Sequence, residues 1–394
     1  MEAKGGFSKP ELQVLANITA SQVKLHAKYG GVFPMMAKRE HAKNLTPILK
    51  QVLKESGLFK NNSPKNYSSI LKNTRIVLKR EPGLAEALVP LLQKIKKPKI
   101  DAIAVTYGPG LEPTLWVGIN FAKALSLAWN IPVIPINHME GHIFSALMEQ
   151  RQVKSNKLKV TRNKQENTSY MLSAISFPAV ALLISGGHTE LVLMKDWFKY
   201  KIIGATRDDA VGEAFDKVAR ILGLPYPGGP EISRLAKLGS HAPKYKLPRP
   251  MLHSGDFDFS FSGLKTAVLY LVRDLEKKHS NILQNVRMSS DIAREFENAC
   301  VEVLVAKTMS ALKKYKTSTL ILGGGVSANE KIRHDMKLAL NEKFPDCALY
   351  LPDTNLTGDN ALMIAGAGYL RAMGAKTGKL KLVANPSAKG NLRL

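Results

Sequence analysis

Short apolar runs of the kind found in buried strands alternate with segments of helical periodicity in the first part of the chain. The run at 12–20 predicts a strand, and the spacing of apolar residues at 45–53 predicts a helix after a glycine turn. Predicted strands at 100–105 and 131–136 then flank a predicted helix at 115–129. This alternation is typical of an α/β protein with an at least partly parallel sheet.

The second half of the chain opens with two apolar runs joined by the short turn Ser-Gly-Gly-His-Thr, which predicts a β-hairpin. The predicted strands here are 179–184, 190–194 and 320–322, and the predicted helices are 212–224 and 291–315. Both halves therefore favour the same α/β class.

The composition describes a globular, membrane-independent protein. A length of 394 residues exceeds what one hydrophobic core usually serves, so we expect two lobes or domains. With 45% hydrophobic and 23% charged residues, collagen, coiled coil and wholesale disorder are excluded. Two cysteines, Cys300 and Cys347, are too few for a disulfide framework. The apolar run at 177–184 is far shorter than the roughly 20 residues that a bilayer requires. We therefore expect a cytoplasmic protein without a membrane partner.

The charge of the chain points to a polyanionic partner such as nucleic acid. Lysine and arginine number 57 against 32 acidic residues, a formal net charge of +25. Two segments carry nearly half of it: 58–99 holds ten basic residues against two glutamates, and 149–170 holds six against two. Their polar composition predicts surface insertions, with helical potential around 84–95 in the first segment and little in the second. Two interpretations stay open for them, solvated loops or an RNA-binding surface.

His138 and His142 in NHMEGH have the i, i+4 spacing that places both imidazoles on one face of a helix. That spacing suits a divalent metal, although it also occurs in structural histidine pairs. In a zinc peptidase of the HExxH type, glutamate follows the first histidine directly. Glu140 instead comes two residues later, about 200° round the helix. The position of Glu140 therefore counts against a metallopeptidase.

Two glycine loops favour a nucleotide. Ser185-Gly186-Gly187 lies between two predicted strands, where backbone amides can approach a phosphate because no Cβ stands in the way. The second loop, 323–329, follows a predicted strand and precedes a predicted helix, a position where free amides bind phosphate. Neither GxxxxGK nor GxGxxG occurs, which excludes a P-loop and a dinucleotide-binding fingerprint.

Taken together, the motifs resemble those of one family. NHMEGH, LLISGGHTELV, DDAVGEAFDKVARILGLPYPGGP, DFSFSGLKTAV, GGGVSAN and TGDNALMIA occur in this order. In order and spacing they are similar to those of the bacterial TsaD family, the tRNA N6-adenosine threonylcarbamoyltransferases. The resemblance extends from about residue 12 to residue 367, apart from the two basic segments.

The resemblance implies a two-lobed actin-like, sugar-kinase-like ATPase (ASKHA) α/β fold, with a ligand cleft between the lobes. Lobe I would comprise 1–148, with the basic insertion at about 58–99, and 149–176 would be a second basic insertion or linker. Lobe II would comprise 177–355, and 356–394 would return to lobe I.

The resemblance also implies the site residues. His138, His142 and Asp359 of TGDN would bind one divalent metal, iron or zinc, with iron favoured by the family. Asp216, without the family, would be interpreted as an ordinary exposed helix carboxylate. No residue is assigned as the catalytic base. The implied substrate-binding residues are Leu183, Ile184, Ser185, Gly186, Gly187, Asp216, Gly229 and Asn329.

The implied reaction is the transfer of a threonylcarbamoyl group from threonylcarbamoyl-AMP to N6 of the adenosine 3′ of a tRNA anticodon, with release of AMP. The implied partners are tRNA, a TsaB-like paralogue and a TsaE-like P-loop ATPase. Two alternatives stay open: a noncatalytic nucleotide-binding or scaffold member of the family, and a metal-dependent peptidase.

The sequence departs from the family pattern at two places. Members open with a strand and hairpin of the type GIETSCDET, which this sequence does not contain. We therefore expect the chain to begin at the third strand of the first lobe, either as part of a longer protein or with another segment in place of the strand. After YGPG, the segment 111–116 carries Glu112 and Trp116 where family members usually have small residues.

Overall fold

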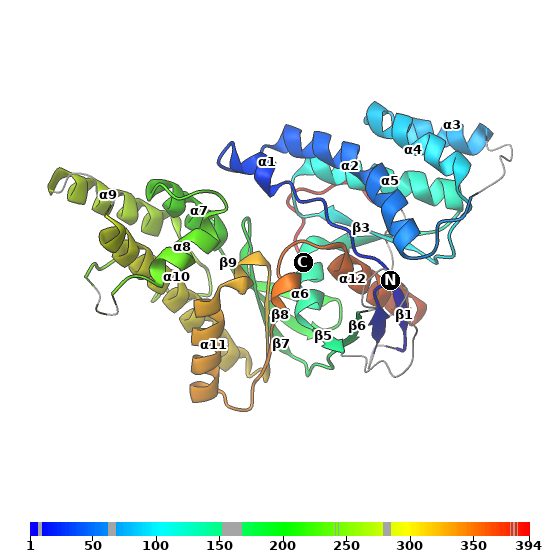
Figure 1. The fold of residues 1–394 in the computed structure, drawn as a ribbon. Coiled ribbons are helices and arrows are strands. Elements are labelled where there is room, and N and C mark those ends of the chain that lie inside the picture. The colour runs from blue at the N-terminus through cyan, green and yellow to red at the C-terminus, as the bar shows by residue number, and fades with distance from the viewer. Residues whose placement is uncertain are drawn as a thin grey trace, which may run out of the picture. The chain divides into compact units, whose positions relative to one another are not determined.

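A computed structural model describes most of the chain. The described residues are 1–6, 10–61, 68–151, 168–240, 242, 244–278, 285–378, 380, 383 and 385–394. The chain divides into two compact units, each with its own sheets and helices (Figure 1). Unit 1 comprises Met1–Gln22, Phe33–Ala174 and Asn360–Leu394, and unit 2 comprises Val23–Val32 and Ile175–Asp359.

The described residues of unit 1 form two small sheets. An antiparallel sheet has the order β1-β2-β6-β5, with β1 at Glu2–Lys4, β2 at Glu11–Gln13, β5 at Met148–Arg151 and β6 at Ser169–Leu172. Strands β3 (Ile103–Gly108) and β4 (Val133–Asn137) form a parallel pair. The strand predicted at 12–20 is wrong beyond residue 13, because only Glu11–Gln13 pair with β6.

The helices of unit 1 correct one interpretation of the basic segment at 58–99. They are α2 (Pro34–Glu55), α3 (Ser68–Val77), α4 (Pro82–Lys94), α5 (Glu112–Trp129), α6 (His138–Ala146) and α12 (Ala361–Lys376). Helix α3 packs against α5, α4 packs against α2 and α3, and Leu78, Leu84 and Leu88 are buried in one core with Val117 of α5. The described part of 58–99 is therefore a helical layer and not a solvated loop. The second basic segment lies largely outside the described residues.

Unit 2 is built on a mixed five-stranded sheet of order β11-β10-β7-β8-β9. Its strands are β7 (Ala179–Ile184), β8 (Thr189–Asp196), β9 (Lys199–Ala205), β10 (Thr319–Gly323) and β11 (Ala348–Tyr350). Strand β10 runs parallel to β7 and β11, whereas β7, β8 and β9 are antiparallel. The predicted hairpin and the α/β class are confirmed.

Unit 2 also contains helices, of which α10 packs against β7 of this sheet. They are α1 (Val23–Ala27), α7 (Val211–Ile221), α8 (Gly228–Ala236), α9 (Ser262–Lys278), α10 (Val286–Tyr315) and α11 (Glu330–Lys343), with 3₁₀ turns η2 (Gly325–Ala328) and η3 (Thr354–Leu356). Helix α10 begins earlier than the predicted 291 because the Asn285 side chain accepts a hydrogen bond from the Met288 amide. Among the described residues, no helix combines the length and apolarity required to cross a membrane.

Asp256 in unit 2 is expected to make the stability of the fold depend on pH in the acidic range. Its carboxylate accepts hydrogen bonds from Ser254 Oγ at 2.6 Å, Arg207 Nη2 at 2.7 Å and Lys307 Nζ at 3.2 Å. The Ser254 hydroxyl is the main cause that lowers the pKa of Asp256 from 3.8 to about 2. A carboxylate with a lowered folded-state pKa stabilises the protein above its unfolded pKa, and this contribution is lost as the pH falls through the folded value.

We therefore expect the free energy of unfolding to decrease between about pH 4 and about pH 2. Asp256→Asn should reduce this slope and should be less stable than the wild type at neutral pH. Urea unfolding followed by circular dichroism across this range measures both effects, with the exposed Asp346→Asn as control. Equal slopes in wild type and Asp256→Asn would contradict the assignment.

Candidate functional site

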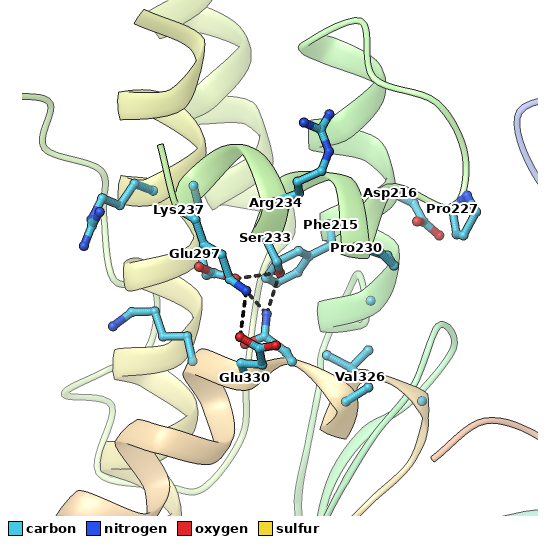
Figure 2. Close-up of a pocket in the computed structure, with 18 of the residues that line it drawn as sticks. Phe215, Asp216, Pro227, Pro230, Ser233, Arg234, Lys237, Glu297, Val326 and Glu330 are labelled. Carbon is cyan, nitrogen blue, oxygen red and sulfur yellow. Dashed lines mark hydrogen bonds and ion pairs between the residues drawn. The ribbon is translucent and has the colours of Figure 1, made fainter. Parts of the chain in front are cut away.

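A cavity of about 950 Å³ opens within unit 2 (Figure 2). It is lined by α7, α8, α10, η2 and α11 together with the turn between β7 and β8. Of the predicted substrate-binding residues, Gly186, Asp216, Gly229 and Asn329 line it. Segments far apart in the sequence, at Gly186 and Asn329, thus meet at one cavity.

Three of the polar residues that line this cavity form a hydrogen-bond network. Asn329 caps α11 by accepting a hydrogen bond from the Ile332 amide at 2.9 Å. Its amide nitrogen donates to Ser233 Oγ at 2.9 Å and to Glu297 Oε1 at 2.7 Å. The Ser233 hydroxyl also donates to Glu297 Oε1 at 2.7 Å (Figure 2). The network fixes the rotamer of Asn329, and sequence reasoning missed both Ser233 and Glu297 because nothing local marks them.

The apolar side of the cavity comes from three elements. Phe215 of α7, Pro230 of α8 and Val326 of η2 line it (Figure 2). Phe215 is held in place by an edge-to-face contact with Phe296, whose ring centroid lies 5.0 Å away. A site with an apolar wall and a few convergent polar groups is the usual form of a small-molecule pocket.

The two glycine loops lie against one another beside the cavity. Gly324 has φ +93° and ψ 162°, a conformation open essentially only to glycine, and an added Cβ would stand 2.2 Å from the Ile184 carbonyl oxygen. A Cβ on Gly212 would stand 2.6 Å from the Ser185 carbonyl oxygen. By contrast, a Cβ on Gly186 would meet nothing within 4 Å. Some glycines therefore allow backbone packing, whereas Gly186 leaves space beside the turn.

The other residues predicted at the first glycine loop do not line the cavity with their side chains. Leu183 and Ile184 end β7 with fully buried side chains, so only their backbone atoms are available to a ligand. The Ser185 hydroxyl accepts a hydrogen bond from the His188 amide at 3.1 Å and folds the turn. Ser185 and Gly187 lie beside Gly186 but are not among the described residues that line the cavity.

Asp216 is half-buried and is not the exposed carboxylate that its helix position alone indicates. Its Oδ1 accepts a hydrogen bond from the Gly228 amide at 2.7 Å, at the start of α8. Burial raises the pKa of Asp216 above its usual value, and the amides of Gly228 and Gly229 oppose that shift. Asp216 thus connects α7 to the glycine turn that begins α8.

His138, His142 and Asp359 lie close together. Helix α6 begins at His138 directly after β4, and Asn137 caps it by accepting a hydrogen bond from the Met139 amide at 2.9 Å. Asp359 precedes Asn360, the residue that caps α12, and α12 packs on α6. The ligand atoms of His138, His142 and Asp359 all lie within 4.8 Å of one another. Two imidazoles and a carboxylate at this spacing fit one iron or zinc ion after small side-chain adjustments.

The packing of α6 on α12 explains both the close approach and the role of Glu140. Gly141 permits it, since an added Cβ would stand 2.9 Å from Ile364 Cδ1. Glu140 is fully buried and accepts a hydrogen bond from Arg371 Nε of α12 at 2.6 Å. Its carboxylate is therefore bound to the neighbouring helix, and it is not part of the histidine and aspartate cluster. This arrangement does not match an HExxH peptidase.

Glu297 offers a test of the polar network. Glu297→Ala removes the acceptor shared by Ser233 and Asn329 and leaves two donors in a nearly closed environment, so we expect a loss of about 1–3 kcal/mol in the free energy of unfolding. Glu297→Gln keeps an acceptor oxygen and should lose less. Urea unfolding measures both variants. Unchanged stability in Glu297→Ala would show that the network contributes nothing.

Comparisons with known proteins agree with these motifs. The sequence profile of the TsaD family, tRNA N6-adenosine threonylcarbamoyltransferase, matches residues 13–89, 82–156 and 165–366. A protein of that name from Burkholderia thailandensis is 41% identical over 91% of this chain and 86% of its own length. Another, from Enterococcus faecalis, is 37% identical over 91% of this chain and 84% of its own length.

Among solved structures, full-length HypF in its phosphate- and nucleotide-bound form matches 76% of this chain and 42% of that chain, with a TM-score of 0.45 and 13% identity. The sequence matches are much stronger and span most of the chain. The chain therefore belongs to the tRNA N6-adenosine threonylcarbamoyltransferase family.

Proposed function

We propose that this chain transfers the threonylcarbamoyl group from threonylcarbamoyl-AMP to N6 of the adenosine 3′ of the anticodon in tRNA. Membership of the family supports the reaction class. The observation that carries the proposal within this chain is the convergence of His138, His142 and Asp359 to within 4.8 Å. We also propose for it the family's two-lobed actin-like, sugar-kinase-like architecture.

In this proposal the cavity of unit 2 binds the AMP part of the mixed anhydride. Phe215 and Val326 offer apolar contact to the adenine, and Asn329 has its amide held in a fixed rotamer by Ser233 and Glu297. The amides of the turn at Gly186 and Gly187 can approach phosphate oxygens because no Cβ intervenes. Leu183, Ile184, Ser185, Asp216 and Gly229 complete the proposed site.

His138, His142 and Asp359 are the residues that would hold one divalent metal ion, of iron or zinc type. When bound, such an ion supplies Lewis-acid polarisation of a carbamoyl or phosphate oxygen. The chain's own contribution is to orient the three ligands. Asn137 caps α6, and Asn360 caps α12 by accepting a hydrogen bond from the Met363 amide at 2.9 Å.

The proposed reaction is an acyl-type transfer. The adenosine N6 attacks the carbamoyl carbon, the bond from that carbon to the phosphate oxygen breaks, AMP leaves with the electron pair, and N6 loses a proton. The target base has to leave the anticodon stack so that its amine edge reaches the carbamoyl carbon. The excess of positive charge on the chain suits a tRNA substrate.

We further propose that the chain acts in the cytoplasm with a TsaB-like paralogue and a TsaE-like P-loop ATPase. The family resemblance supports these partners. Such a requirement has a simple consequence for experiments: activity has to be measured with the chain alone and with both partners added.

The test is direct transfer to RNA. The full chain, with and without the two partners, is incubated with threonylcarbamoyl-AMP and a tRNA transcript that carries adenosine 3′ of the anticodon. Nucleoside mass spectrometry should detect threonylcarbamoyladenosine, and a matched transcript with guanosine at that position should remain unmodified. Nucleotide binding without transfer under every condition would identify a noncatalytic family member instead.

A further inference from the structure

Three exposed cations of the basic segment at 58–99 lie on α3 or in the turn that follows it. Lys72 and Arg75 are exposed on α3 and lie about 60° apart round the helix, and Lys79 is exposed in the turn that follows α3. Thr74 of α3 and Leu78 in the turn after it are fully buried. The segment therefore has a buried face that holds it on the molecule and an exposed face that carries its charge.

The row of cations continues across the start of α4 onto α5. Arg80 lies over the Trp116 ring at 5.3 Å from its centroid, and Lys123 lies over the same ring at 5.9 Å. Such contacts hold flexible cationic side chains in defined positions, so these side chains lose less conformational entropy when a ligand binds. Trp116, a departure from the family pattern in the sequence, thus organises two cations at the end of the α3 row.

These five cations, Lys72, Arg75, Lys79, Arg80 and Lys123, are named the basic stripe. Within the described residues, none of them lies within 4.0 Å of a carboxylate oxygen in an ion pair. The neighbouring Glu81 is 4% exposed, and its Oε2 accepts a hydrogen bond from Asn120 Nδ2 at 3.1 Å. Burial lowers the pKa of the Lys123 ammonium, a cost that a bound anion would offset.

We propose that the basic stripe is a binding surface for the phosphate backbone of tRNA, separate from the site that holds the reacting adenosine. The inference rests on the proposed function for the identity of the RNA. At 1.5 Å per residue, the part of the basic stripe from Lys72 to Lys79 spans about 10 Å, and an RNA backbone presents several phosphates over that length. Unneutralised, partly pre-oriented cations are suited to phosphate contacts, which position a nucleic acid without reading its sequence.

The test compares three triple variants of the full chain in binding to a tRNA transcript, measured by fluorescence anisotropy from 50 to 300 mM KCl. Lys72→Glu with Arg75→Glu and Lys79→Glu should weaken binding at least about tenfold at 150 mM salt and reduce the log–log salt slope by roughly 2 to 3. Lys72→Arg with Arg75→Lys and Lys79→Arg keeps the charge and should bind like the wild type. A charge-matched control, Lys278→Glu with Lys313→Glu and Lys337→Glu, reverses three exposed lysines of unit 2 and should change affinity by less than about twofold.

Thermal melts confirm that each variant is folded, and Arg80→Gln with Lys123→Gln provides a second test that leaves α3 untouched. Unchanged affinity and salt slope in both stripe variants would overturn the proposal. Binding to phosphatidylserine vesicles is measured in parallel. If the stripe variants lose vesicle binding but keep tRNA binding, the proposal is also overturned, because the surface would then be a membrane contact. If the wild type transfers the threonylcarbamoyl group and the stripe variants bind tRNA as the wild type does, this inference is refuted and the proposed function stands. Stripe-dependent binding with no transfer under any condition refutes the proposed function and leaves the stripe in place.

Discussion

Replacing Gly324 with alanine is expected to destabilise unit 2 by about 3–5 kcal/mol and to abolish nucleotide binding in its cavity. The backbone there occupies a glycine-only conformation, which costs another residue about 1–3 kcal/mol. In addition, the new Cβ would stand 2.2 Å from the Ile184 carbonyl oxygen, so β10 and β7 would have to separate where they are paired. A loss of this size is comparable with the total stability of many domains.

Urea unfolding and calorimetric titration with AMP would measure the two effects of Gly324→Ala. The matched control is Gly325→Ala, since a Cβ on Gly325 meets nothing within 4 Å. We expect that control to unfold within about 1 kcal/mol of the wild type. If Gly324→Ala also unfolds like the wild type, the close approach of the two glycine loops is not a structural requirement.

The second large effect is expected from His142→Ala. His142 is fully buried in α6 and is one of three ligands in the proposed metal site, so its removal leaves one imidazole and one carboxylate. We expect the bound metal to fall well below one ion per chain and the rate of transfer to tRNA to fall at least about 100-fold. Metal content by plasma emission spectrometry and transfer by nucleoside mass spectrometry provide independent readouts.

Two further variants separate loss of the metal from loss of packing. Asp359→Asn changes an exposed ligand, so it should lose metal without the packing defect that a buried histidine can cause. His253→Ala removes an exposed histidine in unit 2 and should retain both metal and activity. Chelation of the wild type should reproduce the loss, and reconstitution with iron or zinc should show which ion restores transfer. Stoichiometric metal in both His142→Ala and Asp359→Asn would refute the site.

Elements with a complete local signal were predictable from the sequence. The run Ala179–Ile184 is entirely apolar and ends at a glycine turn, so both the strand and the hairpin follow from short-range pattern. The i, i+4 histidine pair also needs only its own helix, α6. Element ends were less predictable where a side chain decides them, as Asn285 does at the start of α10.

The basic segment at 58–99 was predicted only in part. Its sequence indicated a surface insertion with helical potential at 84–95, and α4 confirms the helix, whose Leu84, Leu88 and Leu92 form a buried face that a surface insertion would not require. The net charge of a segment does not tell on which face of a helix each residue lies. A helix can place its apolar residues on one face and its charged residues on another. The same segment therefore supplies both a hydrophobic core and an exposed row of cations.

By itself, the sequence determined the α/β class, the hairpin and glycine turns, the histidine pair, the excess of positive charge and, through its motifs, the family. Only the tertiary structure decided that Ser233 and Glu297 meet Asn329, and it gave the distances among His138, His142 and Asp359, a group that the motifs implied only through the family resemblance. The physical reason is that periodicity and turn chemistry act over a few residues, whereas these contacts depend on how helices pack across long stretches of chain.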